Sequence, residues 1–208
     1  MKITQIPFND YYKEATNKTQ IYLHHTAGTG KGDDVFGWWG KDKPRIATCV
    51  VIDRDGSIKQ GFGSQFWAYH LGLPNSVFKE NGLSYLNLDK LSIGIELIAW
   101  GQLTKKGEKY YSYTGKEIQG DEVTTLAKPH RGFKHYHSYT QAQIDAVVHL
   151  LKLWKEKYSI DISYNEDIWD VTKRALSGEN GVFTHCSVRK DKVDTFPQIE
   201  LIEALKSL

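Results

Sequence analysis

The stretch IYLHHTAG, residues 21–28, has the apolar residues of a buried strand and ends on two adjacent histidines. Successive side chains of a strand point to opposite faces of a sheet, so His24 and His25 cannot face the same partner. The two imidazoles therefore lie on opposite faces of the sheet, and one of them is directed at a partner that the other cannot reach. The stretch predicts a buried strand whose end carries a functional histidine.

Three other segments have the character of strands. ATCVVIDRDGSIKQGFG, residues 47–63, predicts a hairpin, because its β-branched run leads to Asp55-Gly56, a strong turn signal. SIGIELIAW, residues 92–100, predicts a buried strand with Glu96 on a face otherwise occupied by glycine and isoleucine. GVFTHC, residues 181–186, predicts a further strand that ends in a histidine.

Two segments have helical spacing. TQAQIDAVVHLLKLWKEKY, residues 140–158, starts with a capping box from Thr140 to Gln143. FPQIELIEALKSL closes the chain as a helix with Pro197 in its first turn. Strands that alternate with helices and one hairpin predict an α/β fold, with a central mixed β-sheet flanked by α-helices in a single domain over residues 1–208.

Two other segments are harder to assign. Residues 101–139 are polar, aromatic and weakly periodic, and they have too few aliphatic residues for a core of their own. We therefore expect an insertion into the fold rather than a second domain. VFGWWGKDKP, residues 35–44, is compatible with either a short helix or an aromatic-bearing loop.

Length and composition narrow the classes of protein. The 208 residues carry a net charge of +2 with the two signs interspersed, so nucleic acid is not an expected partner. Two cysteines are too few for a disulfide framework. No apolar run approaches the ~20 residues of a membrane span, and the first residues lack a signal-peptide run. We expect a monomer made in the cytoplasm, which needs another factor to act outside it.

Polar residues at the predicted strand ends suggest a metal site. His24, His185 and Asp194 offer two imidazoles and a carboxylate, which would leave the fourth position of a zinc ion open, as in catalytic sites. Each residue also has an ordinary alternative. A strand-end histidine is often a hydrogen-bonded core residue, Glu96 can be a buried carboxylate satisfied by a tyrosine or an amide, and Lys192 can be a solvated charge.

Five motifs in order carry a resemblance to a known family: IYLHHTAG, ATCVVIDRDGSIKQ, AYHLG, SIGIEL and THCSVRKDKVD. Together they resemble the zinc-dependent N-acetylmuramoyl-L-alanine amidases, which include phage amidase endolysins, anhydromuramyl-peptide-recycling amidases and peptidoglycan recognition proteins. The similarity covers roughly residues 18–100 and 140–208 and leaves residues 101–139 outside. It implies Zn²⁺ as cofactor and peptidoglycan as substrate.

The resemblance assigns roles to residues that match the family motifs. The first histidine of the strand-end pair is a metal ligand, hence His24. The histidine of THCS and the aspartate that closes KVD are the other ligands, hence His185 and Asp194. Lys192 matches the lysine that helps to stabilise the oxyanion in the family, a kind of contact whose removal typically costs about 10²–10³ in rate.

The general base departs from part of the family. Many phage members place a catalytic tyrosine where this chain has Thr48, which lacks a comparably acidic hydroxyl. The recycling amidases use the glutamate of a SIGIEL strand, so the resemblance gives the acid–base role to Glu96. We expect His70, Thr26 and Trp67, together with Thr48, to contact the substrate.

The resulting hypothesis is an amidase that hydrolyses the bond between N-acetylmuramic acid and L-alanine of peptidoglycan. A phage endolysin, released by a holin to act on the cell wall, is the preferred role. A cytoplasmic recycling amidase and a non-catalytic peptidoglycan-binding module are the alternatives. A zinc protease ranks last, because the chain lacks the helical His-Glu-x-x-His motif.

Overall fold

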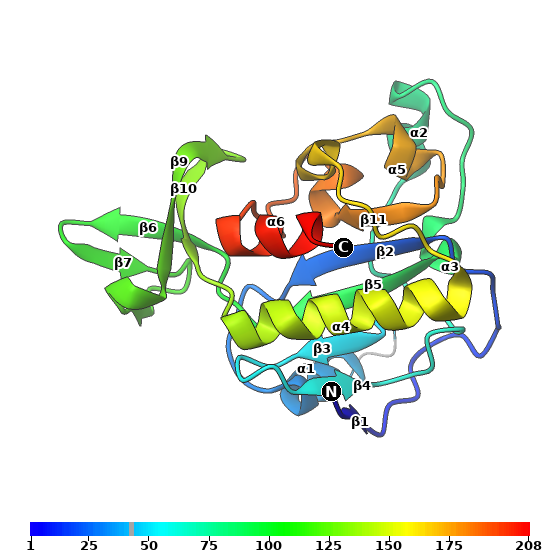
Figure 1. Ribbon diagram of the computed structural model, residues 1–208, viewed down its shortest axis with the longest axis horizontal. Coiled ribbons are helices and arrows are strands. Elements are labelled where there is room, and N and C mark those ends of the chain that lie inside the picture. The colour runs from blue at the N-terminus through cyan, green and yellow to red at the C-terminus, as the bar shows by residue number, and fades with distance from the viewer. Residues whose placement is uncertain (42–43) are drawn as a thin grey trace.

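A six-stranded mixed sheet forms the centre of the computed structural model, which describes residues 1–41 and 44–208 (Figure 1). Its strands, in spatial order, are β1 (Ile3–Gln5), β4 (Ile58–Gln60), β3 (Val50–Ile52), β5 (Ser92–Leu97), β2 (Gln20–His25) and β11 (Gly181–Thr184). Strands β3, β5, β2 and β11 run parallel, whereas β4 pairs antiparallel with β3 and parallel with β1. The predicted α/β class with a mixed sheet is confirmed.

Helices lie on both faces of this sheet. The longest, α4, crosses one face, and α6 packs against it (Figure 1). Helix α1 lies against β3 and β4 on the other face, where Gly32 meets Val51. The helices are α1 (Gly32–Trp39), α2 (Asn75–Glu80), α3 (Leu88–Leu91), α4 (Gln141–Tyr158), α5 (Lys173–Leu176) and α6 (Ile199–Lys206). None of the helices described is long and apolar enough to cross a membrane.

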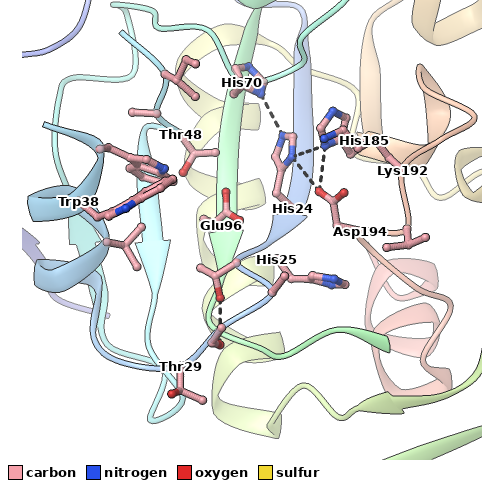
Figure 2. A pocket seen from close by; sticks show the side chains of 18 of the residues that line it. His24, His25, Thr29, Trp38, Thr48, His70, Glu96, His185, Lys192 and Asp194 are labelled. Carbon is pink, nitrogen blue, oxygen red and sulfur yellow. Dashed lines mark hydrogen bonds and ion pairs between the residues drawn. The ribbon is translucent and has the colours of Figure 1, made fainter. Parts of the chain in front are cut away.

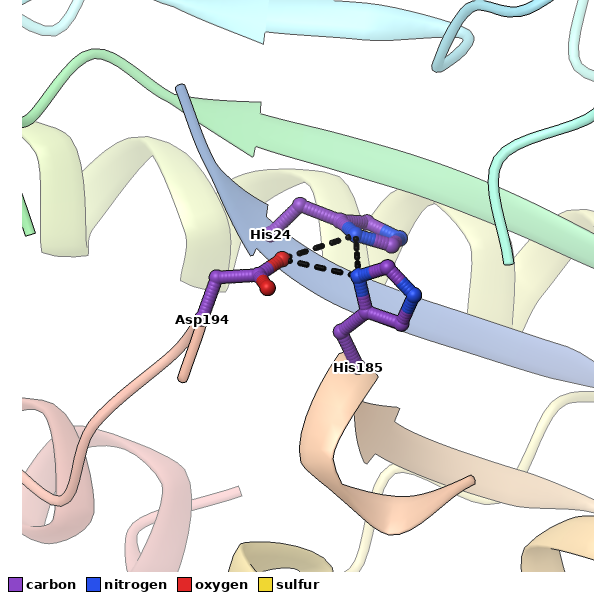
Figure 3. A group of neighbouring side chains, drawn as sticks. All are labelled: His24, His185 and Asp194. Atoms are coloured by element: carbon purple, nitrogen blue, oxygen red, sulfur yellow. Dashed lines mark hydrogen bonds and ion pairs between the residues drawn. The ribbon is translucent and has the colours of Figure 1, made fainter. Parts of the chain in front are cut away.

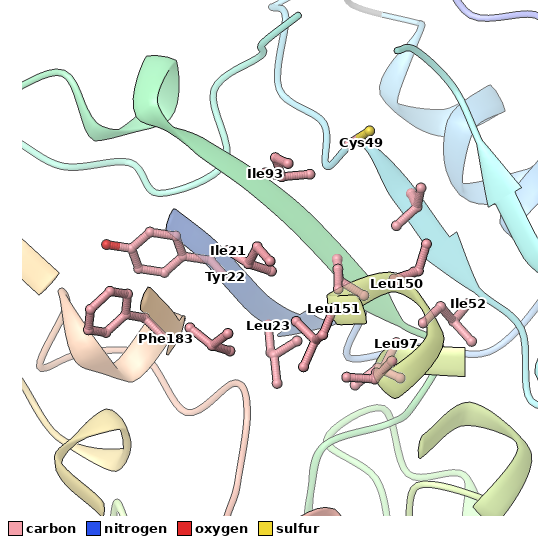
Figure 4. Packing of buried hydrophobic residues seen from close by; sticks show 14 of the residues in the cluster. Ile21, Tyr22, Leu23, Cys49, Ile52, Ile93, Leu97, Leu150, Leu151 and Phe183 are labelled. Carbon is pink, nitrogen blue, oxygen red and sulfur yellow. The ribbon is translucent and has the colours of Figure 1, made fainter. Parts of the chain in front are cut away.

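Alternation along β2 separates the core from the functional face. Ile21 and Leu23 are fully buried on the side covered by α4, and Figure 4 shows Leu23 beside Leu151 of that helix. Tyr22 points to the other side, where its ring packs against Phe183 of β11. His24 follows two residues later on the same face as Tyr22. The apolar core thus determines the direction in which the strand-end histidine points.

The predicted capping box at the start of α4 is confirmed. Thr140 accepts a hydrogen bond from the Gln143 amide at 3.1 Å, and the Gln143 side chain accepts one from the Thr140 amide at 3.1 Å. The amide nitrogen of the same buried Gln143 side chain donates to the carbonyls of Ile52 and Ile98. One residue therefore both starts the helix and attaches it to the ends of β3 and β5.

Several predicted boundaries were wrong by a few residues. The strand expected over 181–186 ends at Thr184, and His185 opens the 3-10 turn η3 (His185–Ser187). Pro197 precedes α6, whose N-cap is Gln198. At the end of β11 the Ser187 hydroxyl accepts a hydrogen bond from the Thr184 amide at 3.0 Å, so the chain turns there instead of continuing the strand. For the segment over residues 35–44, helix α1 covers residues 35–39, whereas residues 42–43 lie outside the described part of the chain.

Residues 101–139 form a second, antiparallel sheet that projects from one side of the central sheet (Figure 1). No strands were predicted there, because Lys, Thr and Tyr occupy both faces and leave little apolar alternation. The spatial order of its strands is β8-β7-β6-β10-β9. Few aliphatic residues of this sheet are buried, which agrees with the expectation that the segment lacks a core of its own. The elements are β6 (Gln102–Lys106), β7 (Lys109–Tyr111), β8 (Glu117–Ile118), η1 (Gly120–Glu122), β9 (Val123–His130) and β10 (Phe133–His137).

His137 connects this second sheet to the core. Its Nδ1 accepts a hydrogen bond from the Trp100 amide at 3.1 Å, and its Nε2 lies 3.6 Å from a Glu122 carboxylate oxygen. Burial lowers the pKa of His137 to about 4; nearby Arg54 adds to the effect, and Glu122 opposes it. The folded protein therefore holds this imidazole in its neutral form at neutral pH.

This burial predicts a pH dependence of stability. The unfolded chain takes up a proton at His137 near pH 6.5, whereas the folded chain does so only near pH 4, so stability falls as the pH drops through this window. The free energy of unfolding of the wild type falls between pH 7 and 4.5, and we expect His137→Gln to make this fall smaller by about 2 kcal/mol. Urea unfolding at both pH values measures the free energy of unfolding of each variant. His149→Gln, at a partly exposed position of α4, is the control. Equal pH slopes in wild type and His137→Gln would contradict the assignment.

Candidate metal centre and active-site cavity

Two histidines and an aspartate converge at the ends of β2 and β11 (Figure 3). His24 Nδ1 lies 3.1 Å from His185 Nδ1, and one oxygen of Asp194 lies 3.2 Å from the former and 2.9 Å from the latter. His24 comes from β2, His185 from η3 and Asp194 from the loop that follows. The three predicted ligands are therefore brought together from segments up to 170 residues apart.

The protons on His185 can be assigned from its other contact. Its Nε2 lies 3.0 Å from the carbonyl oxygen of Leu71, which can only accept a hydrogen bond. Nε2 therefore carries the proton, and in the neutral imidazole Nδ1 keeps a free lone pair. That lone pair points at His24 and Asp194.

A chain of hydrogen bonds assigns the protons of His24 in the same way. The Ser92 hydroxyl donates to the carbonyl of Leu88 at 2.7 Å, so it accepts from His70 Nε2 at 2.8 Å. His70 Nδ1 is then bare and accepts from His24 Nε2 at 3.0 Å. Nδ1 of His24 is consequently also a free acceptor.

Three acceptor atoms therefore face one another without a proton between them. This contact is unfavourable unless a cation lies among the three atoms, and two imidazoles with a carboxylate are a preferred donor set for zinc. Tetrahedral bonds of about 2.0–2.1 Å would place ligand atoms about 3.3 Å apart, close to the observed spacings. The residues present fit a zinc ion with an open fourth position.

Electrostatics at the cluster agree with this protonation state. Burial lowers the pKa of His24 to about 4, and His185 adds to the effect, so the imidazole is neutral and able to coordinate. A neutral imidazole and an ionised carboxylate are the forms that bind metal.

A cavity of about 620 Å³ opens above the cluster, and Glu96 lies in its wall (Figure 2). The parallel register of β2 and β5 pairs His24 with Glu96, so the two side chains emerge on the same face. Among the described residues, no side chain or backbone group forms a hydrogen bond with the Glu96 carboxylate. The alternative of a carboxylate satisfied by a tyrosine or an amide therefore loses its support.

The surroundings of Glu96 alter its acidity. Burial raises the pKa of Glu96 well above its ordinary value, the Asp194 carboxylate adds to the rise, and Lys192 opposes it. A carboxyl group with a raised pKa takes up and returns a proton more readily than an ordinary carboxyl group. Gly94 lies two residues before Glu96 on the same strand. A Cβ atom at this position would lie only 2.8 Å from the Thr48 methyl group, so the packing of Thr48 in the cavity wall requires a glycine here.

Three other predicted residues also line the cavity, but their polar groups differ in availability. Lys192 lines the cavity two residues before Asp194 and is half-buried. The Thr48 hydroxyl donates to the Val50 carbonyl at 3.0 Å and is therefore already engaged. Thr26 is likewise bonded to the backbone of Ala99.

The two remaining predicted substrate contacts differ in position. His70 lines the cavity, but both of its ring nitrogens are already engaged, one with His24 and the other with Ser92. Trp67 does not line the cavity: its ring stacks on Tyr12 with centroids 3.9 Å apart, and its indole donates to Glu14. His25 points away from the cluster, as expected, and its Nδ1 lies 2.8 Å from the Tyr139 hydroxyl.

The structure adds residues that sequence reasoning missed. Trp38 of α1 lines the cavity opposite the metal ligands with 68% of its surface exposed, and Ile46 lines it with 50% exposed (Figure 2). Large apolar side chains left this open beside a polar cluster are typical of a binding wall. The adjacent tryptophans of VFGWWG were a usable signal, because only one of two consecutive helical residues can face the core.

A mixed α/β sheet that presents two histidines and a carboxylate in an open cavity is typical of metal-dependent hydrolases. The family profile of N-acetylmuramoyl-L-alanine amidases matches residues 15–197. The chain therefore belongs to the N-acetylmuramoyl-L-alanine amidase family and is an enzyme of that class. A search of curated protein sequences finds no match.

Solved structures share the fold at low sequence identity. PlyL is 14% identical with a TM-score of 0.58, over 99% of this chain and 98% of that one. A selenomethionine derivative of AmpD is 17% identical with a TM-score of 0.53, over 98% and 93%. The N-acetylmuramoyl-L-alanine amidase LysC from Clostridium intestinale URNW is 14% identical with a TM-score of 0.52, over 100% and 96%.

Removing one ligand should abolish metal binding. We expect His185→Ala to weaken Zn²⁺ binding by more than about 100-fold, since loss of a mere supporting partner of a ligand already costs about 10- to 100-fold. Metal content after dialysis, together with competition against a chromophoric chelator, measures the loss. His149→Ala, on the surface of α4, is the control. A His185→Ala protein that keeps one tightly bound zinc would exclude this site.

Replacing the carboxyl group of Glu96 should separate catalysis from metal binding. Glu96→Gln keeps the size of the side chain but cannot accept a proton, so we expect kcat to fall by about 10²–10⁴ while zinc content and fold are retained. Steady-state kinetics on a muramoyl-peptide measures kcat, and metal analysis of the same sample measures the zinc content. Near-normal turnover would show that another group is the general base.

Proposed function

We propose that the protein is a zinc-dependent N-acetylmuramoyl-L-alanine amidase, which hydrolyses the amide bond between N-acetylmuramic acid and L-alanine of peptidoglycan. The observation that carries the proposal is the convergence of three proton-free acceptor atoms of His24, His185 and Asp194 on the floor of an open cavity. Family membership supports the bond that is cut.

The ligands, Glu96 and Lys192 have distinct parts in this reaction. His24, His185 and Asp194 would hold the zinc ion, which when bound would supply Lewis acidity and a water molecule that is reactive near neutral pH. The Glu96 carboxyl group, desolvated in the cavity wall, accepts a proton from the attacking water and returns it to the leaving amine. The Lys192 ammonium group stabilises the negative charge that develops on the carbonyl oxygen.

The state of Thr48 supports the assignment of Glu96 as the base. The Thr48 side chain is buried and its proton is already donated to the Val50 carbonyl, so it does not replace a catalytic tyrosine. Glu96 carries an acidic group and is paired with His24 in the strand register. The chemistry thus resembles that of amidases that rely on a strand glutamate.

A phage endolysin that acts on the cell wall is the proposed biological role. Structures titled as endolysins, such as LysCS of Clostridium intestinale URNW, share the fold. The fold match to AmpD and the use of Glu96 favour a second candidate, an amidase of soluble anhydromuramyl peptides. A non-catalytic peptidoglycan-binding module is disfavoured, because all three ligand positions hold competent donors.

Hydrolysis of purified cell wall tests the proposal. We expect new amino termini of L-alanine to appear with wild-type protein, to disappear after treatment with EDTA and to return on addition of Zn²⁺. His185→Ala is the matched inactive control. Unchanged activity after exhaustive chelation would refute zinc dependence, and no release of L-alanine termini from any muramoyl-peptide would refute the amidase assignment.

The choice of substrate separates the two roles. An endolysin should cut intact sacculi at least as readily as soluble fragments, whereas a recycling amidase should cut anhydromuramyl peptides and leave sacculi intact. The two substrates are compared at equal concentrations of muramoyl-peptide.

A further inference from the structure

The loop after β11 carries most of the site. Within residues 185–195 it holds two of the three metal ligands, His185 and Asp194, and also Lys192, yet only the 3-10 turn at its start is regular structure. Ligand atoms must be held within a few tenths of an ångström, so a loop of this kind needs outside support. The question is which residues provide it.

The tip of the β9–β10 hairpin contacts this loop directly. Arg131 donates from Nη1 to the carbonyl of Lys190 and from Nη2 to the carbonyl of Cys186, both at 3.0 Å. Nη2 also lies 2.9 Å from a carboxylate oxygen of Asp170. The Arg131 side chain is only 12% exposed, so the guanidinium is packed into the loop rather than extended into water.

The backbone at the hairpin tip is arranged so that this side chain can reach the loop. His130 and Phe133 are paired, which leaves Arg131 and Gly132 as the two turn residues, and their φ angles are 49° and 85°. A tight turn of this kind needs positive φ at both positions, where glycine and asparagine are usual. An arginine at the first position is unusual and is compensated here by its three polar contacts.

Two neighbours on the same hairpin hold the far end of the loop. His130 Nε2 lies 3.2 Å from the carbonyl oxygen of Thr195, the residue after Asp194. The ring of Tyr136 stacks on Phe196 with centroids 4.3 Å apart, and its hydroxyl donates to the His130 carbonyl. Contacts from the second sheet therefore fall directly beside both ligands: at Cys186, next to His185, and at Thr195, next to Asp194.

We infer that the second sheet, residues 101–139, is a clamp for the metal-ligand loop, and that Arg131 is its principal positioning residue. Arg131 joins the backbone beside His185 to the backbone two residues before Lys192, so it sets the spacing between a ligand and the oxyanion-stabilising lysine. The inference rests on the proposed function only for the role of the metal. The inference accounts for the presence of a sheet that has exposed strands and only a small core of its own.

The test measures metal binding and catalysis separately. We expect Arg131→Ala to weaken Zn²⁺ affinity by about 10- to 100-fold, the range for residues that support ligands. kcat should fall at limiting zinc and recover largely at saturating zinc, while KM for a muramoyl-peptide stays within about twofold. Thermal unfolding of the zinc-free protein shows whether the variant is folded.

Three further variants make the result specific. Arg131→Lys keeps a positive charge near Asp170 but lacks the planar fork that reaches two carbonyls, so it should lose affinity like Arg131→Ala. Asp170→Asn leaves the carbonyl contacts in place and should bind zinc like wild type. Lys134→Ala, exposed on the same hairpin, controls for loss of a positive charge. If Arg131→Ala does not fold, Arg131→Lys decides.

If a folded Arg131 variant binds zinc with an affinity within twofold of wild type, the inference that the second sheet is a clamp is wrong. This outcome does not depend on which substrate the protein cuts. The proposed function fails in a different way, through the absence of L-alanine release by wild-type protein loaded with zinc. A loss of affinity in Asp170→Asn equal to that in Arg131→Lys would also overturn the inference, because the ion pair would then be the relevant contact.

Discussion

The parallel pairing of β2 with β5 and with β11 is the constraint on which the site depends. It sets His24 beside Glu96, and it ends β11 beside β2 so that His185 follows at the same edge of the sheet. A slip of one residue would turn the His24 side chain toward the apolar layer under α4 and bring His25 to the position that faces His185 and Asp194. Burial of Ile21 and Leu23 against α4 opposes that slip, so the same packing that stabilises the fold also aims the ligand.

Backbone carbonyls, more than side chains, orient the ligands. Leu71 fixes the tautomer of His185, and Leu88 fixes that of His24 through Ser92 and His70. A carbonyl can only accept, so each chain of hydrogen bonds has one direction and leaves Nδ1 free at its end. The protein in this way places three acceptors together at a buried site, where a bound cation would relieve their mutual repulsion.

The cavity is built from separate parts with different tasks. The central sheet supplies His24 and Glu96, helix α1 supplies the exposed Trp38 on the opposite wall, and the second sheet supports the loop that carries His185 and Asp194. The Thr48 hydroxyl is engaged with the Val50 carbonyl, which is consistent with the proposal that Glu96 transfers the proton. This division explains how an insertion with few buried aliphatic residues can still matter for the chemistry.

Local patterns were enough to predict the buried strand at 21–25, the hairpin, the capped helix α4 and the candidate ligands, because strand alternation, turn residues and caps act between residues close together in the sequence. They were not enough for residues 101–139, whose polar strands have no apolar period, or for Trp67, whose place beside Tyr12 depends on a distant segment. The sequence by itself determined the fold class and which residue types could bind a metal. Only the tertiary structure decided the tautomers of the histidines, the role of His70 and the contacts of Arg131, because each depends on atoms that packing brings together from distant parts of the chain.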